Sequence, residues 1–250
     1  QRTASVFELM RWLNERGLSD PTLGVGQRGT GSLRDVLDET LDDLAFFLRG
    51  RPVRYIELGP EPVKTSAILD GLLLRGVSVE RYLGVDVNPA SAASMTAALR
   101  LRLPVDRIGF RLSRYQDLEP FGRVGDAVNL VTMLGFEEGN EDPWALGKIL
   151  GRIMGPGDLL LSELQLSDGG WNPIHGFYRH LAMRRFSRLS YESAWGGDLR
   201  TTYGVSIVPV TLNGLGAIPV AVAMEKVIEA NHRSNGAVVV TNVCLKPHGL

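Results

Sequence analysis

The sequence has little of the chemistry that cross-links a chain or binds a metal. It contains one cysteine, Cys244, and four histidines among 250 residues. A single cysteine excludes a disulfide within the chain and a zinc site made of several thiolates. The histidines, at positions 175, 180, 232 and 248, do not fall at metal-ligand spacing. We therefore expect no metal centre.

Long hydrophobic runs and an excess of one charge are also missing. No apolar stretch approaches the roughly 18 residues that a membrane-spanning helix needs, and we recognise no leader peptide after Gln1. The 27 basic residues nearly balance the 28 acidic ones, for a formal net charge of -1, which argues against general nucleic-acid binding. We expect a cytoplasmic protein that acts on a small-molecule substrate and binds neither membranes nor nucleic acid.

The middle of the chain alternates short apolar runs with helical periodicity. This alternation predicts an α/β fold: a mainly parallel, doubly wound sheet of the Rossmann-like type. With 44% hydrophobic residues, the chain can bury such a core. The predicted strands are residues 53–58, 82–87, 108–112, 127–133 and 159–164, and the predicted helices are residues 64–75, 90–101 and 144–154.

The two ends of the chain differ from this middle part. Residues 1–50 contain two amphipathic helical patterns, 5–16 and 32–48, which we interpret as a helical segment with a possible lid. Residues 51–250 form the predicted ligand-binding domain. Its last third is β-rich and contains the hairpin turns Asn213-Gly214 and Ser234-Asn235-Gly236, so we expect the sheet to end in antiparallel strands that form the substrate part.

The first candidate ligand loop follows the first predicted strand. Glu57-Leu58-Gly59-Pro60 ends that strand, and Lys64-Thr65 lies at the head of the next helix. In an open parallel sheet, nucleotide-like ligands bind at the carboxyl ends of the strands. Gly59 lets a ligand approach the backbone closely because it has no Cβ.

Acidic residues follow the next two strands. Asp86 ends the second strand, where a carboxylate can accept hydrogen bonds from both hydroxyls of a ribose; its alternative role is to cap the following helix. Asp117 follows the third strand, where it can contact an adenine amino group. Acids at three successive strand ends, without G-x-G-x-x-G after the first strand, favour an adenosine ligand that has no pyrophosphate.

A glycine-rich segment offers a competing interpretation. Gly24-Val25-Gly26-Gln27-Arg28-Gly29 spells G-x-G-x-x-G. It follows Ser-Asp-Pro-Thr rather than a buried strand, so the context that gives this motif its meaning is missing. We interpret it as a loop rather than as a dinucleotide site.

Several of these segments together resemble the histidine-specific methyltransferase family, which includes the ergothioneine-pathway histidine betaine synthase and dimethylallyltryptophan N-methyltransferases. The resemblance covers residues 51–189. It is carried by Glu57-Leu58-Gly59 with Lys64-Thr65, Val85-Asp86-Val87, Met133-Leu134-Gly135 with Gly139-Asn140, and Gly155-Pro156-Gly157-Asp158.

The resemblance implies a class I methyltransferase that uses S-adenosyl-L-methionine and releases S-adenosyl-L-homocysteine. It places part of the chain around the cofactor, and Asn140 at the amino group or carboxylate of an amino-acid-like substrate. Tyr178 falls near a substrate-facing aromatic of the family. The cofactor-binding residues that we predict are Glu57, Gly59, Lys64, Asp86, Asp117 and Leu118.

Departures from the family pattern concern the substrate. Where the family has Glu-x-Ser-x-Lys, whose Glu and Ser recognise an imidazole, this chain has Asn242-Val243-Cys244-Leu245-Lys246. Without the carboxylate, an imidazole N–H loses its charged acceptor. We therefore predict a substrate other than histidine, with Asn242 and Cys244 in its pocket. The family's amino-terminal Tyr-Tyr-x-x-Arg-x-Glu stretch also has no counterpart in residues 1–50.

The expected reaction is transfer of a methyl group to a small amine or amino-acid-derived metabolite in a specialised biosynthetic pathway. Such a displacement depends mainly on positioning and electrostatics. If a base assists, Glu163 and His175 are the candidates, and Glu137 and Glu138 could attract a cationic substrate. Two alternatives stay open: an enzyme of this fold that does not transfer a methyl group, and a non-catalytic protein that contacts a partner through its amino-terminal helices.

Overall fold

A computed structural model describes residues 2–20, 32–135, 142–163, 180–186, 189, 199–212, 216–230 and 240–247. The chain divides into two compact units. One comprises residues 34–164, and the other comprises residues 1–33 together with 165–250.

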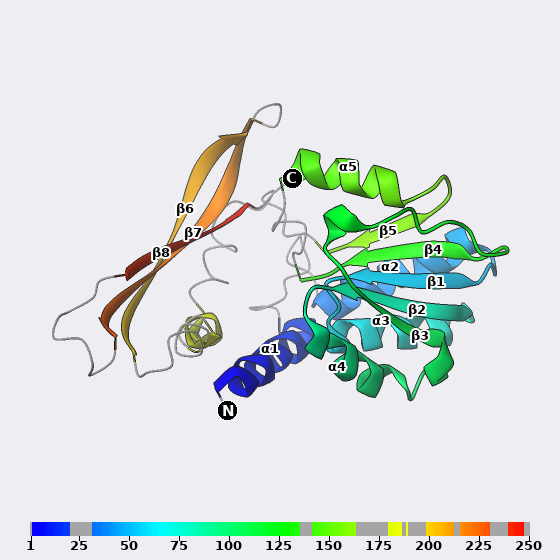
Figure 1. Cartoon of the computed structure of the whole chain (residues 1–250), viewed down its shortest axis with the longest axis horizontal. Helices are drawn as coiled ribbons and strands as arrows, with labels where there is room; N and C mark the ends of the chain where they lie inside the picture. Colours follow the sequence, from blue (N-terminus) through cyan, green and yellow to red (C-terminus); the bar gives the residue numbers. More distant parts are fainter. Residues whose placement is uncertain are drawn as a thin grey trace. The chain divides into compact units, whose positions relative to one another are not determined.

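The first unit contains a five-stranded sheet whose hydrogen-bonded pairs are all parallel. Its strands occur in the order β3-β2-β1-β4-β5 (Figure 1). This order and the helices between the strands confirm the predicted Rossmann-like α/β fold. The strands are β1 (Val53–Leu58), β2 (Val79–Asp86), β3 (Ile108–Leu112), β4 (Val128–Met133) and β5 (Leu159–Ser162).

Helices cover both faces of this sheet because successive residues of a buried strand point to opposite sides. Tyr55 of β1 faces a core formed with α2, α3 and α4. Its neighbour Ile56 faces a second core formed with α5. Figure 1 shows α5 apart from α3 and α4. The helices are α2 (Leu33–Leu48), α3 (Pro62–Leu74), α4 (Pro89–Leu99) and α5 (Pro143–Ile153), and two short 3₁₀ helices, η1 (Val105–Arg107) and η2 (Tyr115–Asp117), flank β3.

The direction of winding reverses between β1 and β4. From β1 the chain proceeds through α3 and α4 to β2 and β3, and it then returns to β4 on the other side of β1. Loops that leave neighbouring strands in opposite directions open a crevice at the carboxyl ends of the strands. A ligand site in this fold is therefore expected at the carboxyl ends of β1, β2, β4 and β5.

The helix α2 belongs to the unit of the parallel sheet. Leu41, Leu44 and Leu48 are buried in the same core as Tyr55 and Tyr82. The domain division predicted from the sequence, 1–50 and 51–250, stays a prediction. The compact units divide the chain between Leu33 and Arg34, at the start of α2.

The second unit contains α1 (Arg2–Ser19) and three long strands, β6 (Leu199–Leu212), β7 (Gly216–Ala230) and β8 (Val240–Pro247). The strands pair antiparallel, as predicted, in the order β6-β7-β8. They form a sheet of their own, because their recorded ladders join β6 with β7 and β7 with β8, whereas we predicted that they would end the parallel sheet. The predicted turn residues 213–214 and 234–236 lie outside the described residues. Within the described residues, no helix is both long and apolar enough to cross a membrane.

Candidate functional site

Gly59 brings the loop after β1 against the end of β2. Its φ of +74° lies in the left-handed region, which residues with a Cβ adopt with strain. In this conformation the Gly59 N–H donates a hydrogen bond of 3.0 Å to the carbonyl of Val85, the residue before Asp86. The glycine and the acid that sequence analysis selected are therefore neighbours in space.

Asp86 is held in place by the beginning of α4. Its Oδ1 accepts a hydrogen bond of 3.0 Å from the Asn88 N–H, and its Oδ2 accepts one of 2.5 Å from the Ser91 hydroxyl. Asn88, not Asp86, caps α4, through a 3.0 Å bond from the Ala90 N–H to its Oδ1. A carboxylate oxygen can accept more than one hydrogen bond, so the half-buried Asp86 keeps acceptor capacity for a ligand.

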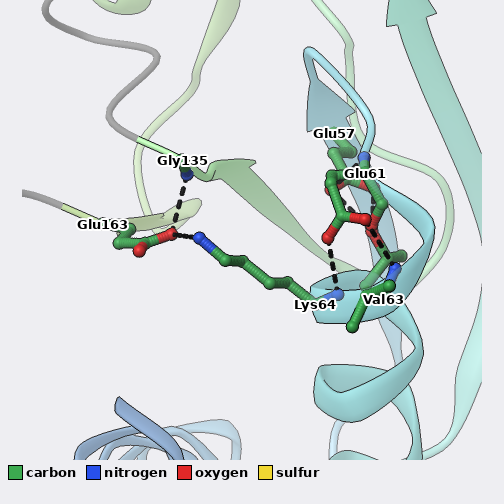
Figure 2. Close-up of polar contacts among 7 residues, drawn as sticks. Glu57, Glu61, Val63, Lys64, Gly135 and Glu163 are labelled. Atoms are coloured by element: carbon green, nitrogen blue, oxygen red, sulfur yellow. Dashed lines mark hydrogen bonds and ion pairs between the residues drawn. The ribbon is translucent and has the colours of Figure 1, made fainter. Parts of the chain in front are cut away.

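Glu61 closes the amino terminus of α3. This acid is the N-cap, and its two carboxylate oxygens accept hydrogen bonds from the N–H groups of Val63 (2.9 Å) and Lys64 (2.8 Å) (Figure 2). Where a helix N-terminus binds a phosphate, its free backbone N–H groups donate the hydrogen bonds. Here a carboxylate already occupies them, so this helix presents negative charge where a pyrophosphate would bind.

Glu57 is completely buried beneath this loop. Its carboxyl group lies 2.6 and 2.7 Å from the Thr65 hydroxyl and accepts a hydrogen bond of 2.8 Å from the Tyr82 hydroxyl. The Glu61 N–H adds a longer contact of 3.4 Å. Burial raises the pKa of Glu57 to about 8, although its hydrogen bonds to Thr65 and Tyr82 oppose that rise. Through these contacts with Glu61 and Thr65, the buried Glu57 helps to hold the loop after β1 in place.

Lys64 and Glu163 join the start of α3 to the end of β5. The Lys64 Nζ lies 2.5 Å from Glu163 Oε2. The same oxygen accepts a hydrogen bond of 2.7 Å from the backbone N–H of Gly135, just after β4 (Figure 2). Both side chains are largely buried, with exposed fractions of 9% and 12%. Lys64, a predicted cofactor-binding residue, and Glu163, a predicted base, thus form an ion pair where the winding of the chain reverses between β1 and β4.

Asp117 and Leu118 lie in the connection after β3. The Asp117 side chain is more than half exposed and forms an ion pair of 3.1 Å with Arg114. Leu118 is fully buried in the core that α5 covers. Its backbone N–H donates to the Tyr115 carbonyl at the end of the 3₁₀ turn. Asp117 is accessible to a ligand, whereas the Leu118 side chain anchors the loop.

The other predicted site residues fall beyond what the structure describes of their side chains. His175, Asn140 and Tyr178 lie outside the described residues, as do Glu137 and Glu138. Asn242 and Cys244 lie in β8, with backbone partners Glu225 and Ala223 in β7. Their assignment to the substrate pocket stays a prediction. Among the residues that the structure describes, no group of three or more potential ligands could hold a metal ion.

The supporting roles of Glu61 and Tyr82 were not predicted, and Thr65 was predicted only as a residue at the head of the helix. One signal for Glu61 was present: an acid followed by Pro62 is typical of a helix N-cap and first helical position. The predicted start of that helix, Lys64, lies two residues after the observed start at Pro62. The contact between Tyr82 and Glu57 carries no local signal, because it depends on the pairing of β1 with β2.

The second unit contains a separate cavity beside α1. It has a volume of about 510 Å³ and is lined by residues such as Trp12, His180 and Arg185. The Nδ1 of His180 accepts a hydrogen bond of 3.1 Å from the Ala182 N–H, and Arg16 lies 5.7 Å from the centre of the Trp12 ring. Trp12 is 42% exposed. The predicted contact between this helix and a partner protein stays a prediction.

In comparisons with known proteins, this chain shows a remote structural similarity to several solved structures. No protein-family model matches the sequence, and no curated protein matches it. The CcbJ methyltransferase from Streptomyces caelestis has 13% identity and a TM-score of 0.38, and the match covers 85% of this chain and 72% of that one. Cofactor-bound Rv0187 from MTB has 14% identity and a TM-score of 0.38, with coverages of 89% and 88%.

A third structure matches over a shorter region. It is a protein from Burkholderia thailandensis bound to S-adenosyl-homocysteine, with 19% identity and a TM-score of 0.30. The match covers 40% of this chain and 25% of that protein, so the chain spans about a quarter of the length of this relative.

Proposed function

We propose that this protein is an S-adenosyl-L-methionine-dependent methyltransferase whose cofactor lies over Gly59 and Asp86. The observation that carries the proposal is the pairing of a left-handed glycine with an acid at the ends of adjacent parallel strands, joined by the bond from Gly59 to Val85. A glycine beside a carboxylate suits a ribose, because the backbone is open and the acid accepts from both hydroxyls.

The charge of the site favours this cofactor over a nucleotide with phosphates. Glu61 occupies the N–H groups of α3 that would bind a phosphate, and Asp86 adds a second acid nearby. S-adenosyl-L-methionine carries adenosine on a sulfonium cation and has no phosphate. Negative charge around the crevice attracts a cation and repels a pyrophosphate.

We propose that the methyl acceptor is the nitrogen of a small amine or an amino-acid-derived metabolite other than histidine. The resemblance to the histidine-specific methyltransferase family supports an amino-acid-like substrate, and Asn242 and Cys244 in place of its Glu and Ser argue against an imidazole. Attack on the methyl carbon needs a neutral amine aligned opposite the departing sulfur. A nearby sulfonium cation favours the neutral form of that amine.

Calorimetric titration tests the cofactor. We expect S-adenosyl-L-homocysteine to bind the intact protein, and NAD to give no heat of binding. Asp86→Ala should weaken the binding by at least tenfold, since a ribose loses its charged acceptor. Asp106→Ala is the matched control: this exposed acid lies in η1, before the first residue of β3. Absence of S-adenosyl-L-homocysteine binding would refute the proposal.

A labelled cofactor separates methyl transfer from other reactions of the same site. With S-adenosyl-L-methionine labelled on the methyl group and a panel of small amines, the label should appear in the product. Conversion of a substrate without label would show instead that the fold catalyses a reaction that does not transfer the methyl group.

A further inference from the structure

The ion pair between Lys64 and Glu163 lies where the winding of the chain reverses, between β1 and β4. It connects α3, which follows β1, with the end of β5, and the Gly135 N–H after β4 completes it. The start of α3, the segment after β4 and the segment after β5 therefore meet at one carboxylate oxygen, Glu163 Oε2 (Figure 2).

The two oxygens of Glu163 are used unequally. Oε2 receives both the Lys64 ammonium and the Gly135 N–H. Within the described part of the chain, Oε1 has no hydrogen-bond partner. An ammonium can donate three hydrogen bonds, and that of Lys64 makes one within the same described part. Both groups therefore have capacity for a further partner.

Lys64 is the only cationic residue in α3, whose sequence is PVKTSAILDGLLL. It stands beside the acids Glu57 and Glu61 at the start of that helix. S-adenosyl-L-methionine has an α-carboxylate at the end opposite its adenine. If that carboxylate reaches the start of α3, it meets Lys64 together with a competing carboxylate, Glu163. Replacement of one carboxylate by another keeps the charge at Lys64 balanced.

We propose that Lys64 exchanges partners when the cofactor binds: the α-carboxylate of S-adenosyl-L-methionine displaces Glu163 from the ammonium, and Glu163 then faces the crevice as a proton acceptor. This inference rests on the proposed function. It assigns two states to Glu163, one held by Lys64 in the empty protein and one released in the complex. The base thereby becomes available only after the cofactor is in place.

The released Glu163 would serve the transfer step in a balanced way. The amine nitrogen of the substrate forms the new bond to the methyl carbon, and the carbon–sulfur bond breaks with its electron pair left on sulfur. The methylated nitrogen then gives up a proton, and the Glu163 carboxylate accepts it.

Two ligands separate exchange from a static ion pair. S-adenosyl-L-homocysteine has the α-carboxylate, and 5′-methylthioadenosine lacks it. Calorimetric titration of each ligand into the wild type, Glu163→Gln and Lys64→Met compares their affinities. Exchange predicts that the two substitutions affect only the ligand that has the α-carboxylate.

The expected change in affinity has opposite signs for the two residues. Exchange means that Glu163 competes with the ligand, so Glu163→Gln should bind S-adenosyl-L-homocysteine several-fold more tightly than the wild type. Lys64→Met should bind it about 10- to 100-fold more weakly, the range expected for loss of a charge-assisted hydrogen bond. Neither substitution should change the affinity for 5′-methylthioadenosine by more than about twofold.

The matched control is Asp70→Asn. Asp70 lies in α3, the helix that contains Lys64, and the substitution breaks its ion pair with Arg102. It should leave the affinity for both ligands unchanged, and thermal unfolding checks that all three variants are folded. Binding of S-adenosyl-L-homocysteine that is no tighter in Glu163→Gln than in the wild type would overturn the exchange but leave the proposed function intact. Failure of both adenosine ligands to bind would overturn the proposed function and the exchange with it.

Discussion

The hydroxyl of Tyr82 donates a hydrogen bond of 2.8 Å to the carboxyl group of Glu57 inside the parallel sheet. The two residues come from adjacent strands, β2 and β1, and Tyr82 also stacks on Tyr55 with 5.7 Å between the ring centres. This contact places a buried acid under the loop that carries Gly59. The acid is costly to ionise there, and this has consequences for stability.

The stability of the protein should fall with rising pH because of Glu57. Burial raises its pKa in the folded state from 4.5 to about 8. Below pH 4.5 the group is neutral in both states, and its contribution to stability is complete. Between pH 4.5 and 8 the unfolded chain releases the proton more readily, so the free energy of unfolding decreases, by at most about 5 kcal/mol.

Glu57→Gln tests this prediction because glutamine has the same shape and stays neutral. Urea unfolding measured from pH 4.5 to pH 9 should show the wild type losing stability relative to the variant as the pH rises. A difference in unfolding free energy that does not change over this range would show that Glu57 titrates normally in the folded protein.

Tyr82→Phe should shift the same pH dependence upward. The Tyr82 hydroxyl lowers the pKa of Glu57 by stabilising the charged form. Without it, Glu57 should hold its proton to higher pH, and the decline in stability should extend further into the alkaline range. The lost hydrogen bond also costs about 1 kcal/mol at pH 5. An unfolding midpoint whose pH dependence matches that of the wild type would contradict this role.

Gly84→Ala should destabilise the sheet next to Glu57. A Cβ at Gly84 would lie 2.7 and 2.9 Å from two ring carbons of Phe110, and 3.0 Å from the Tyr82 hydroxyl. Overpacking of this kind costs about 1 to 3 kcal/mol. Phe110→Leu should recover part of the loss in the double variant, which thermal unfolding of the four proteins in a double-mutant cycle would measure.

Gly147→Ala is the matched control for Gly84→Ala. Gly147 lies within α5, and a Cβ there would meet nothing within 4 Å. Because alanine favours a helix more than glycine does, we expect this change to stabilise the protein by about 0.5 to 1 kcal/mol. Equal destabilisation by both substitutions would mean that the space around Gly84 does not decide the effect.

Glu61→Ala should weaken the start of α3. The variant leaves the N–H groups of Val63 and Lys64 without their carboxylate partner, and loss of an N-cap costs about 1 kcal/mol. Glu61→Gln keeps an acceptor oxygen and should lose less. Chemical denaturation of both variants gives the two values, and the prediction fails if Gln and Ala are equally destabilising.

Local patterns predicted most of the first unit. The strands β1 and β3 begin and end where their apolar runs predicted, and the helices α3, α4 and α5 each lie within two residues of the predicted bounds. Each of the three helices begins at a proline that follows its N-cap, Glu61, Asn88 or Asp142. The parallel order of the sheet followed from the alternation of strand and helix.

The candidate site was predictable only as a set of residues. Gly59 and Asp86 could be chosen because each ends an apolar strand, and their proximity is a consequence of parallel pairing. The roles of Lys64 and Glu163 were assigned separately, one to the cofactor and one to proton transfer. Their ion pair joins residues 99 positions apart, and no local pattern encodes such a contact.

The sequence by itself determined the α/β class, the acids at the strand ends and the absence of a dinucleotide motif after β1. The tertiary structure decided which of these groups face one another: Glu57 beneath the loop with Tyr82, Asp86 beside Gly59, and Glu163 against Lys64. The reason is physical. Periodicity and capping act over a few neighbouring residues, whereas burial, ion pairing and the pKa of Glu57 depend on strands and helices that meet only when the sheet assembles.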